Sequence, residues 1–88
     1  MAKGKDISMR QLRYFMAAAE AGQLSQAAVK VHVSQSAITA AVLQLEQTLG
    51  VRLFDRLPYG VTLTAEGHKS AQHAGHILDT LQDALSEP

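Results

Sequence analysis

Residues 24–49 read LSQAAVKVHVSQSAITAAVLQLEQTL, and this stretch decides the fold. We expect a short helix that is capped by Ser25 and ends at Val31, because serine favours the position that precedes a helix. A turn of about three residues follows. Ser34 then caps a longer helix that ends at Leu49. A short helix, a tight turn and a longer helix together make a helix-turn-helix.

The longer helix has two different faces. Its apolar side chains recur at intervals of four, three and four residues, which predicts one buried stripe of Ile38, Val42, Leu45 and Leu49. The opposite face then presents short and mostly polar side chains, as the second helix of a helix-turn-helix needs in order to enter a major groove. These outward residues are Gln35, Ser36, Thr39, Ala40 and Leu43.

The outward face carries groups that suit the edges of base pairs. Gln35 can make paired hydrogen bonds to adenine N6 and N7, and the hydroxyls of Ser36 and Thr39 can reach bases or phosphate. The methyl groups of Thr39 and Ala40 can touch a thymine methyl. A plainer interpretation stays open, in which residues 34–36 only cap the helix and the alanines only favour it.

The flanking segments complete a mostly α fold. A helix over 8–21 is expected before the helix-turn-helix, with Gly22 as its stop signal. Two β-capable runs over 51–56 and 61–63 flank a Pro/Gly turn, which predicts a hairpin or wing. We therefore expect a winged helix-turn-helix of three helices plus a short two-stranded wing, followed by a long dimerisation helix. The expected parts are a flexible arm at 1–7, a DNA-binding unit at 8–63 and a linker helix at 64–86.

The last helix is expected to start at Thr64 and to carry an apolar stripe at heptad spacing. The stripe consists of Ala71, Ala74, Leu78, Leu81 and Leu85. We favour an antiparallel pairing of this stripe with the same helix of a second copy, since it extends beyond what a domain of this size can cover. The alternative is that the stripe packs back on the core of its own chain.

Composition narrows the class of protein. The 88 residues are 47% hydrophobic and carry a formal net charge of zero, which by itself argues against nucleic acid. The charge is polarised, however, because residues 1–60 hold seven cationic and four anionic side chains, whereas residues 61–88 hold one and four. The absence of cysteine excludes disulfides and thiolate metal sites and fits a cytoplasmic location. No apolar run approaches the ~20 residues of a membrane span.

Six motifs, in order and spacing, resemble the N-terminal domain of LysR-type transcriptional regulators. They are MRQLRYF at 9–15, GQLSQAA at 22–28, HVSQSAI at 32–38, Leu45-Glu46, LGVRLFDR at 49–56 and LTAEG at 63–67. The resemblance covers residues 7–85. It implies a winged helix-turn-helix, a dimerising linker helix and dyad-symmetric promoter sites as targets. It also implies that a ligand-sensing domain is missing, so that an effector and a tetramer belong only to a longer parent protein.

The resemblance also implies which residues touch DNA. Base contacts would fall on Gln35, Ser36, Thr39 and Ala40. Phosphate contacts would fall on Gln23, Ser34, Arg52 and Arg56, and we add Lys30 and Arg10 as cationic candidates. The chain departs from the family where Ser36 replaces a usual proline and where Ala40-Ala41 replaces a long basic or polar pair. Ala40 shifts the expected base recognition from guanine towards methyl contacts and DNA shape.

Two other classes of protein compete with a DNA-binding regulator. A winged-helix interaction module that no longer binds DNA would fit the zero net charge. An enzyme is disfavoured, because no nucleophile–base pair, paired acids or phosphate-cradling glycine loop is visible. His68, His73 and His76 on the last helix lack an acid or thiol that would complete a metal site, so we expect neither metal nor cofactor.

Overall fold

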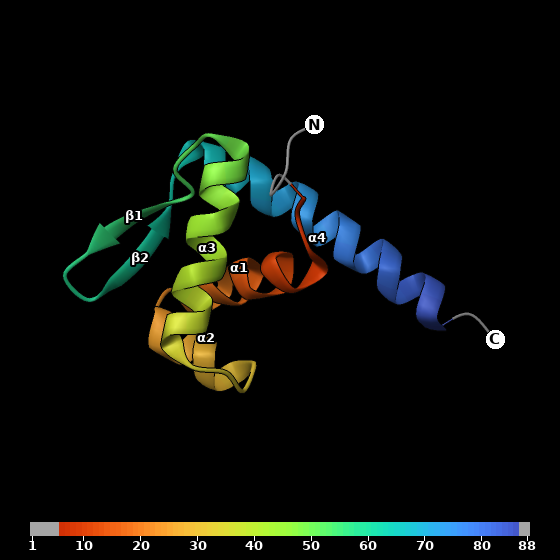
Figure 1. Cartoon of the computed structure of the whole chain (residues 1–88), viewed down its shortest axis with the longest axis horizontal. Helices are drawn as coiled ribbons and strands as arrows, with labels where there is room; N and C mark the ends of the chain where they lie inside the picture. Colours follow the sequence, from red (N-terminus) through yellow and green to blue (C-terminus); the bar gives the residue numbers. More distant parts are fainter. Residues whose placement is uncertain (1–5, 87–88) are drawn as a thin grey trace.

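The computed structural model describes residues 6–86. These residues fold into three helices, a two-stranded hairpin and a long final helix (Figure 1), which confirms the predicted winged helix-turn-helix architecture. Lys3, Lys5 and most of the predicted N-terminal arm lie outside the described residues. The elements are α1 (Met9–Ala21), α2 (Leu24–Lys30), α3 (Gln35–Leu49), β1 (Phe54–Leu57), β2 (Gly60–Leu63) and α4 (Ala65–Ser86).

Most helix ends lie where the capping residues predict them. Ser8 forms a capping box with Gln11, in which each side chain bonds to the backbone N–H of the other residue. Gly22 and Gly50 end α1 and α3 in the left-handed conformation, both with φ of 72°, which glycine adopts without a steric penalty. At the start of α4, the Thr64 hydroxyl accepts a hydrogen bond from the Gly67 N–H at 2.9 Å.

The prediction that Ser25 caps the second helix is wrong. Gln23 is the N-cap of α2, with an extended backbone at φ −146° and ψ 135°, and no side chain caps this helix. The left-handed turn at Gly22 places Gln23 directly before the first helical residue, so the helix begins at Leu24. Ser25 therefore lies in the first turn of α2 with its side chain exposed.

The hairpin has shorter strands and a tighter turn than the sequence suggests. Phe54 pairs with Leu63 and Leu57 with Gly60, so only Pro58 and Tyr59 remain in the turn. Residues 51–53 stay outside the ladder because the backbone of Leu53 bonds elsewhere. Its N–H donates to the Glu46 carboxylate at 2.8 Å, and its carbonyl accepts from the Thr64 N–H at 3.0 Å.

The core lies where α1 packs between the other helices and the base of the hairpin. The rings of Phe15 and Phe54 meet edge to face, with centroids 5.5 Å apart at 66°. Ala18 and Ala27 are fully buried, and because their side chains are small the helices can approach closely. Leu49 is exposed, contrary to the predicted stripe, because it is the last residue of α3 and lies beside the apolar hollow at Ile77 rather than under a neighbouring element.

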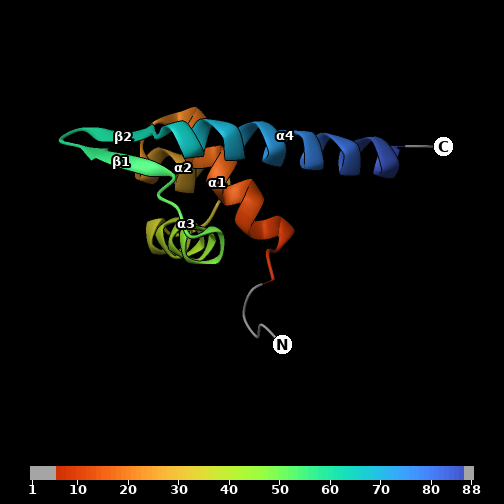
Figure 2. The same ribbon diagram turned by 90° about the horizontal axis from the view of Figure 1, so that it is seen from above.

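The long helix α4 divides into a covered half and a projecting half. Figure 1 and Figure 2 both show its C-terminal half extending away from the body of the domain. Gly67 is buried, and Ala74 is only 2% exposed because it packs into the core of the same chain. The prediction that Ala74 offers surface to a second copy is therefore wrong, and Ala71 is partly buried against the same core. Within residues 6–86, no helix is both long and apolar enough for a bilayer crossing.

Candidate nucleic-acid interface

The outward face of α3 is built as its periodicity predicts. Ile38, Val42 and Leu45 are buried and anchor one side of the helix in the core. The other side lines a shallow, open hollow on the surface of the domain. Figure 2 shows α3 as the outermost element on the side of the domain opposite α4. The hollow is formed by Gln35, Ser36, Thr39, Ala40 and Leu43.

The first turn of α3 holds its serines in place. The Ser34 hydroxyl accepts a hydrogen bond from the Ala37 N–H at 3.1 Å and lies 3.0 Å from the Ser36 hydroxyl. Serine at the N-cap thus satisfies one backbone donor and leaves the remaining N–H groups of the first turn facing solvent. Both hydroxyls are exposed at the end of the helix that carries the positive end of its dipole.

The outward face of α3 lacks ionic groups. Glu46 is the one charged residue among residues 35–49. Its carboxylate accepts the hydrogen bond from the Leu53 N–H described above, so it points towards the entry of the hairpin. Any contact of this face with a ligand must therefore use amide, hydroxyl and apolar groups.

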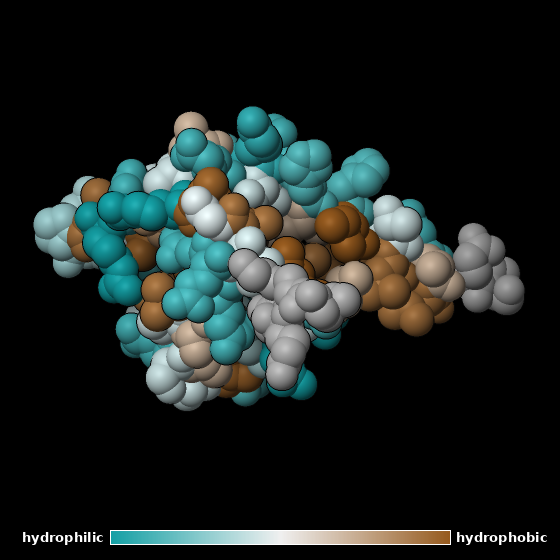
Figure 3. Space-filling model, turned by 45° about the horizontal axis from the view of Figure 1, so that its top comes forward, coloured by the Kyte–Doolittle hydropathy of each residue, from teal (hydrophilic) through white to brown (hydrophobic). Residues whose placement is uncertain are grey.

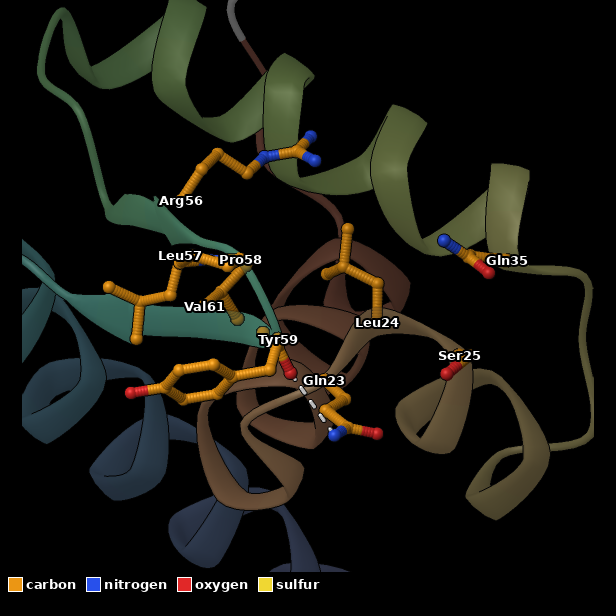
Figure 4. A pocket seen from close by; sticks show the side chains of 10 residues that line it. Gln23, Leu24, Ser25, Gln35, Arg56, Leu57, Pro58, Tyr59 and Val61 are labelled. Atoms are coloured by element: carbon orange, nitrogen blue, oxygen red, sulfur yellow. Dashed lines mark hydrogen bonds between the residues drawn. The ribbon is translucent and has the colours of Figure 1, made fainter.

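A second hollow separates the tip of the hairpin from the starts of α2 and α3 (Figure 4). Its volume is about 530 Å³, and its lining includes Gln35 of α3 and Arg56 of β1. Gln23 crosses towards the hairpin, where its amide N–H donates to the Tyr59 carbonyl at 3.1 Å. This bond uses the side chain that was predicted to contact phosphate, and no local sequence pattern indicates it.

The start of β2, next to the hairpin turn, is also bonded to the segment that joins α1 to α2. The Val61 N–H donates to the Gly22 carbonyl at 2.9 Å. A Cβ atom at Gly60 would lie 2.3 Å from the same carbonyl oxygen, so only glycine fits there. Together with the bond from Gln23, these contacts set the position of the wing relative to the helix-turn-helix.

The cationic side chains predicted to contact phosphate differ in whether they already form an ion pair. Residues 6–86 contain two ion pairs, Lys30 with Glu20 at 2.9 Å and Arg52 with Asp55 at 3.2 Å. Both pairs are exposed and therefore weak, so a phosphate group can readily replace the carboxylate partner. Arg10 and Arg56 are exposed and take part in neither pair.

The histidines of α4 do not gather into a site. His68, His73 and His76 are all exposed. Across residues 6–86, no three His, Asp or Glu side chains lie close enough together to hold a metal ion.

Comparison with known proteins identifies this arrangement. Residues 9–68 match the family described as bacterial regulatory helix-turn-helix protein, lysR family. The chain belongs to the LysR family. Its helix-turn-helix is the DNA-binding domain of a LysR-type regulator, as the sequence predicted, and its named relatives are transcriptional regulators rather than enzymes.

Two curated LysR-family relatives illustrate the match. The HTH-type transcriptional regulator TcbR of Pseudomonas sp. strain P51 is 47% identical over 73 residues, which cover 83% of this chain. The SDS degradation transcriptional activation protein of Pseudomonas sp. strain ATCC 19151 is 44% identical over 82 residues, or 90% of this chain. The aligned parts make up 25% and 27% of those proteins, so the chain spans about a quarter of their length.

Solved structures of LysR-family domains have the same fold. The CbnR DNA-binding domain in complex with DNA is 44% identical with a TM-score of 0.84, and the alignment covers 88% of each chain. The BenM DNA-binding domain bound to benA site 1 DNA is 33% identical, also with a TM-score of 0.84, over 90% of this chain and 89% of that one.

Leu43 lines the same hollow as the candidate residues of α3, but the sequence prediction left it out of the site. It was placed on the outward face but received no role, because an exposed leucine alone is unremarkable on a protein surface. Its spacing from Ser36, Thr39 and Ala40 is seven, four and three residues, which puts all four on one side of a helix. That spacing was the available signal.

Proposed function

We propose that this chain binds double-stranded DNA in a sequence-specific way, with α3 in the major groove and the hairpin beside the adjoining backbone. The observation that carries the proposal is the outermost position of α3, whose exposed face consists of groups able to contact base edges. The DNA complexes of the similar CbnR and BenM domains support it. The proposed base contacts are Gln35, Ser36, Thr39 and Ala40.

Phosphate contacts hold such a helix in register without reading sequence. The proposed set joins exposed cations to groups around the two helix starts, and it consists of Arg10, Gln23, Lys30, Ser34, Arg52 and Arg56. Lys30 and Arg52 would exchange their carboxylate partners for phosphate oxygens. Gln23 would contact phosphate through its backbone N–H, since its side-chain amide holds Tyr59.

The proposed active form is a homodimer on a dyad-symmetric promoter site. The supporting observation is the projecting half of α4, where Leu78 and Leu81 are partly exposed and Leu85 is 72% exposed. Figure 3 shows hydrophobic surface continuing along this half of the helix. Residues 8–63 would then form the DNA-binding unit and residues 64–86 the dimerising helix. A cytoplasmic location, with access to DNA, follows from this function.

The other proposed features of the regulator belong to the part of its relatives that this chain does not cover. An effector-sensing domain and a tetramer are proposed only for a longer parent protein, because the chain covers about a quarter of its curated relatives. No cofactor is proposed for the described chain.

A salt titration tests DNA binding against the alternative of a protein-interaction module. The affinity for a duplex selected from a random pool should fall about 10-fold or more between 50 and 200 mM salt, since phosphate contacts release counterions. An interaction module would enrich no duplex from the pool and would not bind the pool even at the lowest salt concentration. That result would remove the proposed function and leave only the fold.

A further inference from the structure

We propose that Leu43, together with Ala40 and the methyl group of Thr39, forms an apolar shelf on α3 that recognises the C5-methyl groups of thymines. This proposal rests on DNA binding through α3 and adds the chemistry by which the helix selects its sites. The three residues line the same shallow hollow as Gln35 and Ser36. Gln35 and Ser36 supply its polar end, and Leu43 with Ala40 supplies its apolar end.

The exposure of Leu43 is the first observation behind the shelf. Its side chain is 51% exposed, although it lies directly beside the buried Val42 in the middle of the helix. Leucine in such a position leaves apolar surface in contact with water, and covering that surface with another apolar group is favourable. On the face of α3 that meets the major groove, the apolar group that base pairs present is the thymine methyl.

The absence of cationic and acidic groups on this face is the second observation. Arginine and lysine are the usual donors to guanine, and carboxylates accept from cytosine. Residues 35–49 contain no arginine or lysine, and the carboxylate of Glu46 is bonded to the Leu53 N–H. Arg56 of β1 borders Thr39 and Leu43, and the Ser36 and Thr39 hydroxyls can bond to any base. The groups of α3 itself that tell base pairs apart are the Gln35 amide for adenine and the apolar side chains for thymine. Both select A·T pairs.

Replacing thymine with deoxyuridine removes the methyl group and keeps every hydrogen-bonding group of the base. The experiment measures Kd for a duplex selected from a random pool and for variants with single thymine-to-deoxyuridine replacements. We expect one or two positions in each half-site where the replacement weakens binding about three- to ten-fold, the range for losing one buried methyl contact.

Leu43→Ala assigns those positions to the shelf. In this variant the ratio of Kd values for deoxyuridine and thymine should fall to within about two-fold of one at a position that Leu43 covers. Val29→Ala is the matched control, because Val29 is an apolar residue of α2 that is 75% exposed and lies outside α3. It should keep the full ratio. Thermal unfolding of both variants checks that the fold is retained, and the ratio stays informative even if overall affinity changes.

Two outcomes overturn the shelf while leaving DNA binding intact. One is equal affinity for the thymine duplex and for every deoxyuridine variant. The other is a thymine preference that survives unchanged in Leu43→Ala, which would assign it to other residues or to DNA shape. Failure of the wild-type chain to enrich any duplex from the pool at low salt would instead remove the proposed function itself.

Discussion

Gln35 is the residue on which sequence recognition depends most, because its side chain can pair with adenine through two hydrogen bonds. Gln35→Ala should weaken binding to the preferred site by about 1–3 kcal/mol and relax the preference at one base pair. Gln47→Ala is the matched control, since it removes an exposed amide near the far end of the same helix. Competition binding against sites mutated one base pair at a time measures both effects. Equal weakening on all sequences would assign Gln35 to the DNA backbone.

Gly67 and Gly75 lie in the same helix, but the same substitution should have opposite effects on them. A Cβ atom at Gly67 would lie 2.1 Å from the Leu53 carbonyl oxygen, whereas at Gly75 the nearest atom is the Met16 methyl carbon at 3.7 Å. Gly67→Ala should therefore destabilise the fold by about 1–3 kcal/mol through overpacking. Gly75→Ala should stabilise it by about 0.5–1 kcal/mol, because alanine favours helix. Urea unfolding measures both, and a stabilised Gly67→Ala would contradict the close packing of α4 on residue 53.

At the scale of elements, Glu46 joins the end of α3 to the entry of the hairpin. Its carboxylate accepts a hydrogen bond from the partly buried Leu53 N–H. Glu46→Ala should cost about 1–3 kcal/mol of unfolding free energy because a buried donor loses its partner. Glu46→Gln should recover part of that loss, since an amide oxygen also accepts. Glu20→Ala is the control, and breaking its exposed pair with Lys30 should change stability by less than about 1 kcal/mol.

The helices of this domain are predictable from sequence because their ends are local. Ser8, Gly22, Ser34 and Gly50 act through contacts within a few residues, so each could be assigned before the structure was known. The start of α2 was misplaced because Ser25 is the favoured type of capping residue, whereas the turn at Gly22 makes Gln23 the N-cap without a side-chain hydrogen bond. Leu53 was assigned to a strand because the distant partners of its backbone, Glu46 and Thr64, leave no mark in the local pattern.

The candidate site was predictable in outline and incomplete in detail for the same reason. The outward face of α3 follows from periodicity, which is a local property. The bond between Gln23 and Tyr59 spans 36 residues and could not be inferred from either side chain alone. On α4, Ala74 and Leu78 follow the same heptad spacing, but the core covers only the first of them. Spacing shows which residues share a face and not how far a neighbouring element extends along it.

At the scale of the whole molecule, the exposed apolar side chains on the projecting half of α4 favour dimerisation. A single helix half that carries Leu78, Leu81 and Leu85 exposes an apolar stripe that water does not favour, and a second copy in antiparallel orientation would cover both stripes at once.

Leu81→Asp should therefore convert a dimer to a monomer, because it places a charge in the middle of the paired stripe. Thr80→Asp is the matched control, since it adds the same charge in the same turn at an exposed position off the stripe. Sedimentation equilibrium should give the monomer mass for the first variant and the dimer mass for the second. On a duplex with two half-sites, the monomeric variant should lose about 100-fold in affinity, as two linked binding events become independent, whereas its affinity for a single half-site should not change. A dimer mass for Leu81→Asp would show that the copies pair through another surface, and the apolar hollow beside Ile77 and Leu49 would be the next one to test.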